Sequence, residues 1–238
     1  MTAGYIFDYG GTLDTGGQHW GKVLWHAYER HRVPVTEAQF REAYIHAERT
    51  LGRNPIIHPD FTFRQTLEEK IRIEMEYLRG TWNVACGMSD VEAVVDDVYC
   101  LTKAHTNQSC RVLKAIKDCG LPMVLVSNFY GNMSVVLQEF GFNGLFLHVI
   151  ESAIVGIRKP DPRIFLLGVE ALGLKPEEVT VVGDSLDKDI IPAHRAGCQT
   201  VWLKGEGWTN EEKSPETGDW NSVIITCLDE LLEMNKTK

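Results

Sequence analysis

Residues 5–14 read Tyr-Ile-Phe-Asp-Tyr-Gly-Gly-Thr-Leu-Asp. The apolar run from Tyr5 to Phe7 ends in Asp8, and a Gly-Gly pair follows one residue later. A short apolar run that is closed by a turn signal indicates a buried strand. Because open α/β sheets bind their ligands beyond the carboxyl ends of the strands, this pattern predicts that Asp8 lies where the chemistry takes place.

Three later segments also carry polar side chains next to a predicted strand end or turn. They are Val124–Asn128 (Val-Leu-Val-Ser-Asn), Arg158–Pro162 (Arg-Lys-Pro-Asp-Pro) and Val181–Ser185 (Val-Val-Gly-Asp-Ser), the last followed by Asp189. In a parallel sheet the carboxyl ends of the strands meet at one edge. We therefore expect four side chains to converge there: Asp8, Ser127, Lys159 and Asp184. Their carboxylate oxygens suit Mg²⁺ better than zinc, and the ammonium and hydroxyl suit an anion.

The segment after the first strand has helical periodicity without a strand signal. Helices are expected over 36–51 and 62–80, and each is opened by a Thr and a Gln at the spacing of a capping box. A further helix is expected from residue 89, and the spacing of the apolar residues from Trp20 to Tyr28 is also helical. Together these four helices predict a helical bundle. A separate short helix is expected over 111–119.

From residue 106 onward strands and helices alternate, which predicts a parallel sheet with helices on both faces. Pro192 should kink or shorten the helix expected over 187–196. The predicted organisation is an α/β core made of residues 1–15 and 106–238, with a helical domain of residues 16–105 inserted after the first strand.

The chain has 238 residues, of which 44% are hydrophobic, and a net charge of −9. This size and composition are typical of a globular protein with one large domain or two unequal ones. The acidic charge argues against a nucleic acid or an anionic membrane as partner, because both need clustered Lys and Arg. The six cysteines form no Cys-x-x-Cys pair, and no run of 18 apolar residues occurs. We expect a cytoplasmic protein with reduced thiols.

In their order and spacing, the four segments resemble the motifs of the haloacid dehalogenase superfamily. The resemblance extends along nearly the whole chain. It implies a three-layer α/β/α Rossmann-like core with a parallel sheet, and a helical-bundle cap over the active site. It also implies a Mg²⁺-dependent phosphohydrolase or phosphotransferase that acts on a small phosphorylated metabolite. One position departs from the family pattern, since the second aspartate of the first motif is replaced by Gly10.

The resemblance assigns a role to each matching residue. Asp8 resembles the nucleophile that attacks phosphorus and forms an aspartyl-phosphate. The implied Mg²⁺ ligands are Asp8, Asp184 and the carbonyl oxygen of Gly10. Asp189 resembles an outer-shell acid that holds a metal-bound water or orients Lys159. The implied phosphate contacts come from Tyr9, Gly10, Ser127, Asn128 and Lys159.

Gly10 lacks the side chain that, in the resembled phosphatases, protonates the leaving group and later deprotonates water. General acid–base catalysis contributes about 10²–10⁴-fold, so we expect weakened hydrolysis of alkyl phosphates. One alternative is therefore a non-catalytic protein that binds a phosphorylated metabolite or has a regulatory role. Asp184 and Asp189 argue against dehalogenation, because the dehalogenases proper lack the acidic fourth motif.

A further alternative is a phosphonatase-like C–P hydrolase, since such relatives also lack the acid and use a cap lysine to form a Schiff base. Lys70 is disfavoured for this role because it lies in the charged stretch Glu-Glu-Lys, which indicates a solvated surface.

The cap offers three candidate substrate contacts, His19, Arg49 and Arg53. His19 enters the cap and is the candidate stand-in acid, whereas either arginine could bind a second anionic group. Asp14 is expected to be a structural residue of the loop that leads to the cap. The cap residues follow no recognisable specificity code, so the sequence leaves the substrate and the oligomeric state open.

Overall fold

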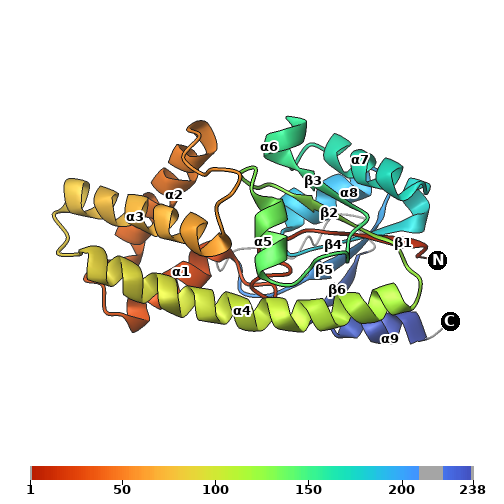
Figure 1. Cartoon of the computed structure of the whole chain (residues 1–238), viewed down its shortest axis with the longest axis horizontal. Coiled ribbons are helices and arrows are strands. Elements are labelled where there is room, and N and C mark those ends of the chain that lie inside the picture. Colours follow the sequence, from red (N-terminus) through yellow and green to blue (C-terminus); the bar gives the residue numbers. More distant parts are fainter. Residues whose placement is uncertain (1, 209–221, 237–238) are drawn as a thin grey trace.

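The computed structural model describes residues 2–208 and 222–236. Within these residues, six parallel strands form one sheet in the order β3-β2-β1-β4-β5-β6 (Figure 1). The strands are β1 (Gly4–Phe7), β2 (Met123–Ser127), β3 (His148–Glu151), β4 (Val179–Gly183), β5 (Gln199–Leu203) and β6 (Val223–Ile225). β1 is central, because Ile6 lies opposite Val124 of β2 on one side and Val181 of β4 on the other. The predicted α/β class is confirmed, although the sequence pattern does not indicate β6.

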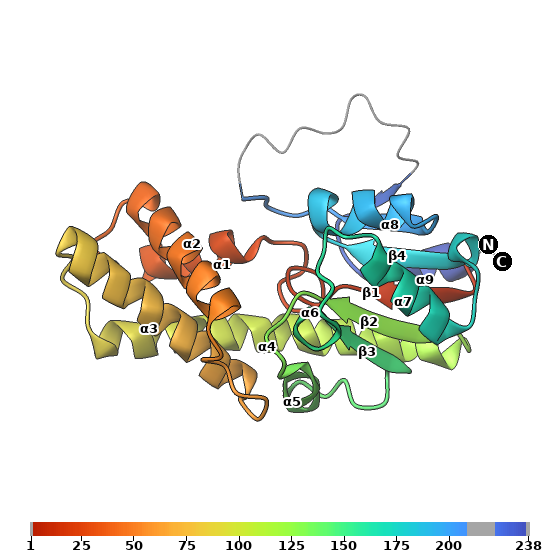
Figure 2. The ribbon, with the colours of Figure 1, turned by 90° about the horizontal axis from the view of Figure 1, so that it is seen from above.

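Helices cover both faces of the sheet and give three layers (Figures 1 and 2). They are α5 (Met133–Glu139), α7 (Arg163–Leu172), α8 (Ile191–Arg195), α9 (Glu230–Lys236) and the second half of α4 (Met88–Asp118). Successive side chains of a strand point to opposite faces. Ile6 of β1 is accordingly buried in the cluster that holds Phe165 of α7. Phe7 belongs to the other apolar cluster, with Leu113 of α4 and Leu231 of α9.

The chain between β1 and β2 is helical, as the sequence predicts, and forms a cap at one end of the molecule (Figure 1). The cap consists of α1 (Trp20–Arg30), α2 (Glu37–Arg53), α3 (Phe63–Trp82) and the first half of α4. Thr36 and Gln39 form the predicted capping box of α2, and Thr62 and Gln65 form that of α3. The caps fix where both helices begin.

Helix α4 corrects one expectation. It runs without interruption over Met88–Asp118, a length of 31 residues, where the sequence predicts two helices. It also crosses the predicted boundary between residues 105 and 106. No Gly or Pro occurs in 88–118, so the chain contains no residue that would end the helix there. α4 packs against α1 and α3 in the cap and against α9 in the core, and thereby joins the two parts.

The chain after β4 turns tightly before it becomes helical. Leu186–Ile190 form a π-helical turn, and α8 begins at Ile191 with Pro192 in its first turn. The sequence predicts a kink or a shortening here, and the helix is shortened because proline lacks the backbone donor that a longer helix needs. Two further short segments are α6 (Ser152–Val155) and the 3₁₀ turn Pro176–Glu178. None of the described helices has the length and apolar character needed to cross a membrane.

Candidate active site

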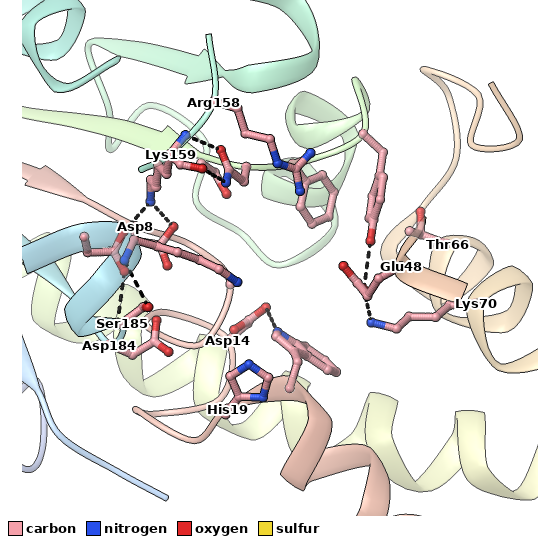
Figure 3. A pocket seen from close by; sticks show the side chains of 18 of the residues that line it. Asp8, Asp14, His19, Glu48, Thr66, Lys70, Arg158, Lys159, Asp184 and Ser185 are labelled. Carbon is pink, nitrogen blue, oxygen red and sulfur yellow. Dashed lines mark hydrogen bonds and ion pairs between the residues drawn. The ribbon is translucent and has the colours of Figure 1, made fainter. Parts of the chain in front are cut away.

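The carboxyl ends of the central strands open into a cavity of about 150 Å³ between the core and the cap (Figure 3). Asp8 follows β1, Ser127 ends β2, Asp184 follows β4, and Lys159 lies in the loop before α7. All four side chains line the cavity. The structure therefore brings together the residues that the sequence places at strand ends, although they are far apart along the chain.

The ammonium of Lys159 is buried between two carboxylates. Its Nζ donates to Oδ1 of Asp8 at 2.5 Å and to Oδ1 of Asp189 at 2.7 Å. Burial acts to lower the pKa of Lys159, but the two carboxylates outweigh it and raise this pKa. Asn128 holds the backbone on both sides, because its amide donates to the Lys159 carbonyl at 3.1 Å and accepts from the Lys159 N–H at 3.0 Å. The side chain of Asn128 thus positions the lysine.

Three carboxylates, those of Asp8, Asp184 and Asp189, each place one oxygen within 4.8 Å of the others. Burial raises the pKa of Asp8 to about 6, against the opposing charge of Lys159. Burial and the two neighbouring carboxylates raise the pKa of Asp184 well above its usual range. Thr12, to which the sequence assigns no role, places its hydroxyl 3.2 Å from Oδ2 of Asp8 and 3.1 Å from Oδ1 of Asp184. The cluster thus has three carboxyl groups, of which two contact the single ammonium of Lys159.

The two glycines after Tyr9 differ in what they permit. Gly11 has a φ of 100°, and a Cβ there would lie 2.4 Å from Oδ2 of Asp184, so glycine is required. Gly10 lies outside the left-handed region, and a Cβ there would make only an ordinary contact with Nε1 of Trp20, at 3.8 Å. Backbone and space therefore both allow a side chain at residue 10. Tyr9 buries its side chain in the core and is not among the residues that line the cavity.

Asp14 is buried in the same loop and lines the cavity. Its Oδ1 accepts from the N–H of Gly11 at 2.7 Å, and its Oδ2 accepts from Nε1 of Trp20 at 3.1 Å. Burial raises the pKa of Asp14 to about 8, and the charge of Asp8 acts in the same direction. The sequence predicts a structural loop residue here, and the structure adds that the carboxyl faces the cavity (Figure 3).

His19 lines the cavity at the start of the cap. Its Nδ1 accepts from the N–H of Gly21 at 3.0 Å and caps α1. Burial lowers the pKa of His19 to about 4, and the positive charge of Lys188 adds to this effect. The ring is therefore neutral near pH 7, which makes it a poor source of a proton for a leaving group.

Arg49 and Arg53 do not line the cavity, and both side chains are exposed on α2. The expectation that they bind a substrate in this cavity is therefore corrected. The side of α2 that faces the cavity carries Tyr44 and Glu48 instead. Residues four apart share one face of a helix, so Tyr44 and Glu48 lie on the face toward the cavity. The two arginines lie on other sides of the helix.

Lys70 also differs from expectation, because it is buried and lines the cavity rather than facing solvent. Its ammonium is ion-paired with Glu48 and lies 4.3 Å from the centroid of the Tyr44 ring. The hydroxyl of Tyr130 donates to the same glutamate at 3.3 Å. Burial acts to lower the pKa of Lys70, but Glu48 outweighs it and raises this pKa. Lys70 lies three residues after the buried Leu67, and this helical spacing is the sequence signal for its burial. The charged neighbours of Lys70 concealed that signal.

The chain matches a family model described as haloacid dehalogenase-like hydrolase over residues 2–197. The glyceraldehyde 3-phosphate phosphatase of Methanocaldococcus jannaschii is 38% identical over 134 residues, which are 56% of this chain and 55% of the relative. The phosphoserine phosphatase of Thermus thermophilus is 37% identical over 112 residues, 44% of each protein. The chain thus spans about half the length of these curated relatives.

Solved structures resemble the chain over nearly its whole length. The crystal structure of a dehalogenase with an intermediate complex has a TM-score of 0.65 at 18% identity, and the match covers 98% of this chain and 96% of the other. A phosphatase from Thermococcus onnurineus has a TM-score of 0.56 at 20% identity, with coverage of 99% and 98%. At such low identity these likenesses establish the fold alone.

Proposed function

Because the chain belongs to the haloacid dehalogenase-like hydrolases, we propose that it is a Mg²⁺-dependent phosphatase of a small phosphorylated metabolite that works through an aspartyl-phosphate on Asp8. The observation that carries this proposal is the Asp8 carboxylate in the cavity, held through Oδ1 by the buried ammonium of Lys159. The curated relatives that match are phosphatases of small phosphorylated compounds, which supports the same reaction class here.

The acidic cluster fits Mg²⁺, because its donors are hard oxygens and its carboxylates raise one another's pKa. In this proposal Asp8, Asp184 and the carbonyl oxygen of Gly10 hold the ion. Asp189 is less suited to direct ligation, since its Oδ1 accepts from Lys159 and its Oδ2 accepts a backbone N–H at 3.1 Å. We assign it to orienting Lys159. When bound, Mg²⁺ would offset the negative charge of the nucleophile and of the phosphoryl oxygens.

Each group of the site has a separate role in phosphoryl transfer. A carboxylate oxygen of Asp8 attacks phosphorus, and the bond to the leaving alcohol breaks as the Asp8–phosphorus bond forms. Ser127 and the backbone amides of Tyr9 and Gly10 donate to the phosphoryl oxygens. Lys159 supplies a fixed positive charge beside the nucleophile, and such preorganised groups stabilise the charge that develops. Water then attacks phosphorus, and inorganic phosphate leaves as the Asp8 carboxylate is restored.

The cavity is suited to small anionic substrates. Lys70 and Lys159 line it but are paired with carboxylates. Arg158 and Lys188 also line it, and neither forms an ion pair with another residue of 2–208 or 222–236, so these two cations can attract an anion. The cavity lies between the cap and the strand ends, which favours small metabolites over macromolecules. The substrate class is therefore a small phosphorylated metabolite, whose non-phosphate part lies against the cap.

Two rivals each have one favourable observation. Lys70 in the cavity favours a phosphonatase-like C–P hydrolase, but a Schiff base needs a neutral amine, and Glu48 holds this lysine as an ammonium. Gly10 favours a protein that binds a phosphorylated metabolite without turning it over. Dehalogenation gains nothing from Asp184, because it needs no metal.

Phosphate release from a panel of phosphorylated metabolites with Mg²⁺ separates these functions. The proposal requires release from at least one class of ester by the wild type and loss of it in Asp8→Asn. Release from a β-carbonyl phosphonate alone, lost in Lys70→Met, would favour C–P cleavage. Thermal stabilisation by a metabolite without any turnover would favour the binding protein.

A further inference from the structure

Gly10 leaves the proposed reaction without its usual acid, although the loop has room for one. The missing side chain would extend toward Nε1 of Trp20, which lies 3.8 Å from the position of a Cβ at residue 10. That same Nε1 already donates to a carboxyl group, the Oδ2 of Asp14, at 3.1 Å. An acidic side chain at residue 10 would therefore lie near the Trp20 indole, where the carboxyl group of Asp14 already lies.

The place of Asp14 meets the geometric needs of a proton donor. It is buried, it lines the cavity, and it belongs to the loop that also carries Asp8. Figure 3 shows its carboxyl on the cavity wall, between the side of Asp8 and the ring of His19. The Gly11 N–H at 2.7 Å and the Trp20 indole fix one oxygen each, so the group is held rigidly.

The other acids of the cavity already have partners or a proposed role. Asp8 and Asp189 both accept from the Lys159 ammonium, and Glu48 is ion-paired with Lys70. Asp184 accepts from the hydroxyl of Thr12 and is a proposed Mg²⁺ ligand. The two donors recorded for Asp14 within residues 2–208 and 222–236 are both neutral. A carboxyl group that lies away from cations and is buried keeps its proton at neutral pH, in accord with its raised pKa of about 8.

We infer that Asp14 is the general acid and base of this site, and this inference rests on the proposed phosphatase function. In the first step its carboxyl gives its proton to the oxygen of the leaving alcohol as the phosphorus–oxygen bond breaks. In the second step its carboxylate takes a proton from the water that attacks phosphorus, while the bond to Asp8 breaks. The proton that Asp14 loses is thus restored, and the net reaction is hydrolysis.

Two ionisable groups of the same loop interact with Asp14. The Asp8 carboxylate raises the pKa of Asp14, and the charge of Asp14 in turn raises the pKa of the buried phenol of Tyr9. On the cap side Trp20 is the contacting group, and it carries no charge. Formation of the aspartyl-phosphate keeps a negative charge near Asp14, so the acid form stays favoured until the leaving group departs.

The test compares Asp14→Asn with the wild type on an alkyl phosphate and on an aryl phosphate such as 4-nitrophenyl phosphate. An aryl leaving group departs without a proton, so only the second step should suffer. We expect turnover of the alkyl phosphate to fall by about 10²-fold or more. With the aryl phosphate we expect a burst of one nitrophenolate per site, followed by slow turnover. Equal loss on both substrates without a burst would overturn the inference.

A rescue variant separates loss of the carboxyl group from misfolding as the cause of lost activity. Gly10→Asp combined with Asp14→Asn restores a carboxyl at the position where the family carries it, and the backbone there allows a side chain. We expect the double variant to turn over the alkyl phosphate at least about tenfold faster than Asp14→Asn does. This gain is a small part of the rate enhancement that general acid catalysis contributes. Failure of this rescue in a variant that melts like the wild type would overturn the inference.

Trp20→Phe is the matched control for position. It removes the indole donor at 3.1 Å and keeps an aromatic ring, so alkyl turnover should fall and an aryl burst like that of Asp14→Asn should appear. The pH profile gives an independent readout, because the wild-type rate on the alkyl phosphate should decline above about pH 8 and Asp14→Asn should lack this limb. The same decline in Asp14→Asn would contradict the inference. A wild type inactive on every ester would instead refute the proposed function itself.

Discussion

The ammonium of Lys159 lies 2.5 Å from Oδ1 of Asp8, and this contact joins the loop before α7 to the end of the central strand β1. Both side chains are buried. A charge pair of this kind is costly to break, because removal of one partner leaves the other charged and without solvent. The pair therefore links the stability of the core to the chemistry proposed for the site.

Lys159→Met should destabilise the protein by about 3–5 kcal/mol near pH 8, because the Asp8 and Asp189 carboxylates then face each other without a cation. The loss should shrink toward pH 5, because burial raises the pKa of Asp8 to about 6 and this carboxyl group then binds a proton. Urea unfolding at the two pH values, without added metal, measures both effects. The exposed pair Arg163–Asp161 is the matched control, and Arg163→Met should change the unfolding midpoint little. A Lys159→Met protein as stable as the control would contradict this account.

Asp184→Ala should abolish Mg²⁺ binding, since Asp184 is one of the three proposed ligands and lies in the carboxylate cluster. Calorimetry of Mg²⁺ binding to the wild type and the variant measures this directly. Asp161→Ala removes a carboxylate outside the cavity lining and should bind Mg²⁺ as the wild type does. Unchanged Mg²⁺ affinity in Asp184→Ala would refute the metal site.

Gly10→Ala and Gly11→Ala should behave in opposite ways. At residue 10 the new methyl group meets Trp20 at an ordinary distance of 3.8 Å, so melting temperature and Mg²⁺ binding should be retained. At residue 11 it would lie 2.4 Å from the Asp184 carboxylate on a backbone of positive φ, so Gly11→Ala should lose Mg²⁺ binding and melt several degrees lower. Similar melting curves and Mg²⁺ isotherms for the two variants would contradict the claim that residue 10 has room for a side chain and residue 11 has not.

Glu74 gives a pH dependence that is independent of the active-site cluster. Burial raises the pKa of Glu74 to about 7, and its Oε2 accepts from the hydroxyl of Tyr28 at 2.9 Å. The folded protein thus holds this proton more tightly than the unfolded chain, whose glutamate titrates near 4.5. This contribution to stability is fully present below about pH 4.5 and is lost as the pH rises through 7.

Glu74→Gln removes the charge and can still accept from Tyr28. The variant should unfold at higher urea than the wild type at pH 8, and the difference should vanish near pH 4. Glu76→Gln, on the exposed side of the same helix, is the control and should show no such pH trend. A Glu74→Gln variant that is less stable than the wild type at pH 8 would contradict the prediction.

The sequence predicts the core well because its key residues follow strong local signals. Ser127 ends an apolar strand, and Asp8 and Asp184 each follow one directly. Parallel topology then brings all three to one edge. The two capping boxes of α2 and α3 are equally local. The strand β6 and the continuity of α4 required the structure. So did the turn that contains Gly11, since its need for glycine comes from Asp184, far away along the chain.

The residues on the cap side of the site could not be predicted from local sequence signals. Lys70 has charged neighbours, and its burial depends on Glu48 of another helix. Arg49 has a charge that suits a substrate, but the rotation of α2 turns it to solvent. Asp14 resembles an ordinary loop residue until the position of Trp20 is known. In each case the deciding partner is distant in sequence, so periodicity alone could not identify it.

The most direct test of the central claim is to identify the phosphorylated residue. The protein is mixed with Mg²⁺ and an aryl phosphate, quenched in acid within the first turnover, digested and examined by mass spectrometry. The account predicts a phosphoryl group on Asp8 in the wild type, enriched in Asp14→Asn because the second step is slowed, and absent from Asp8→Asn. Turnover without a phosphorylated Asp8, or a phosphoryl group on another residue, would contradict it.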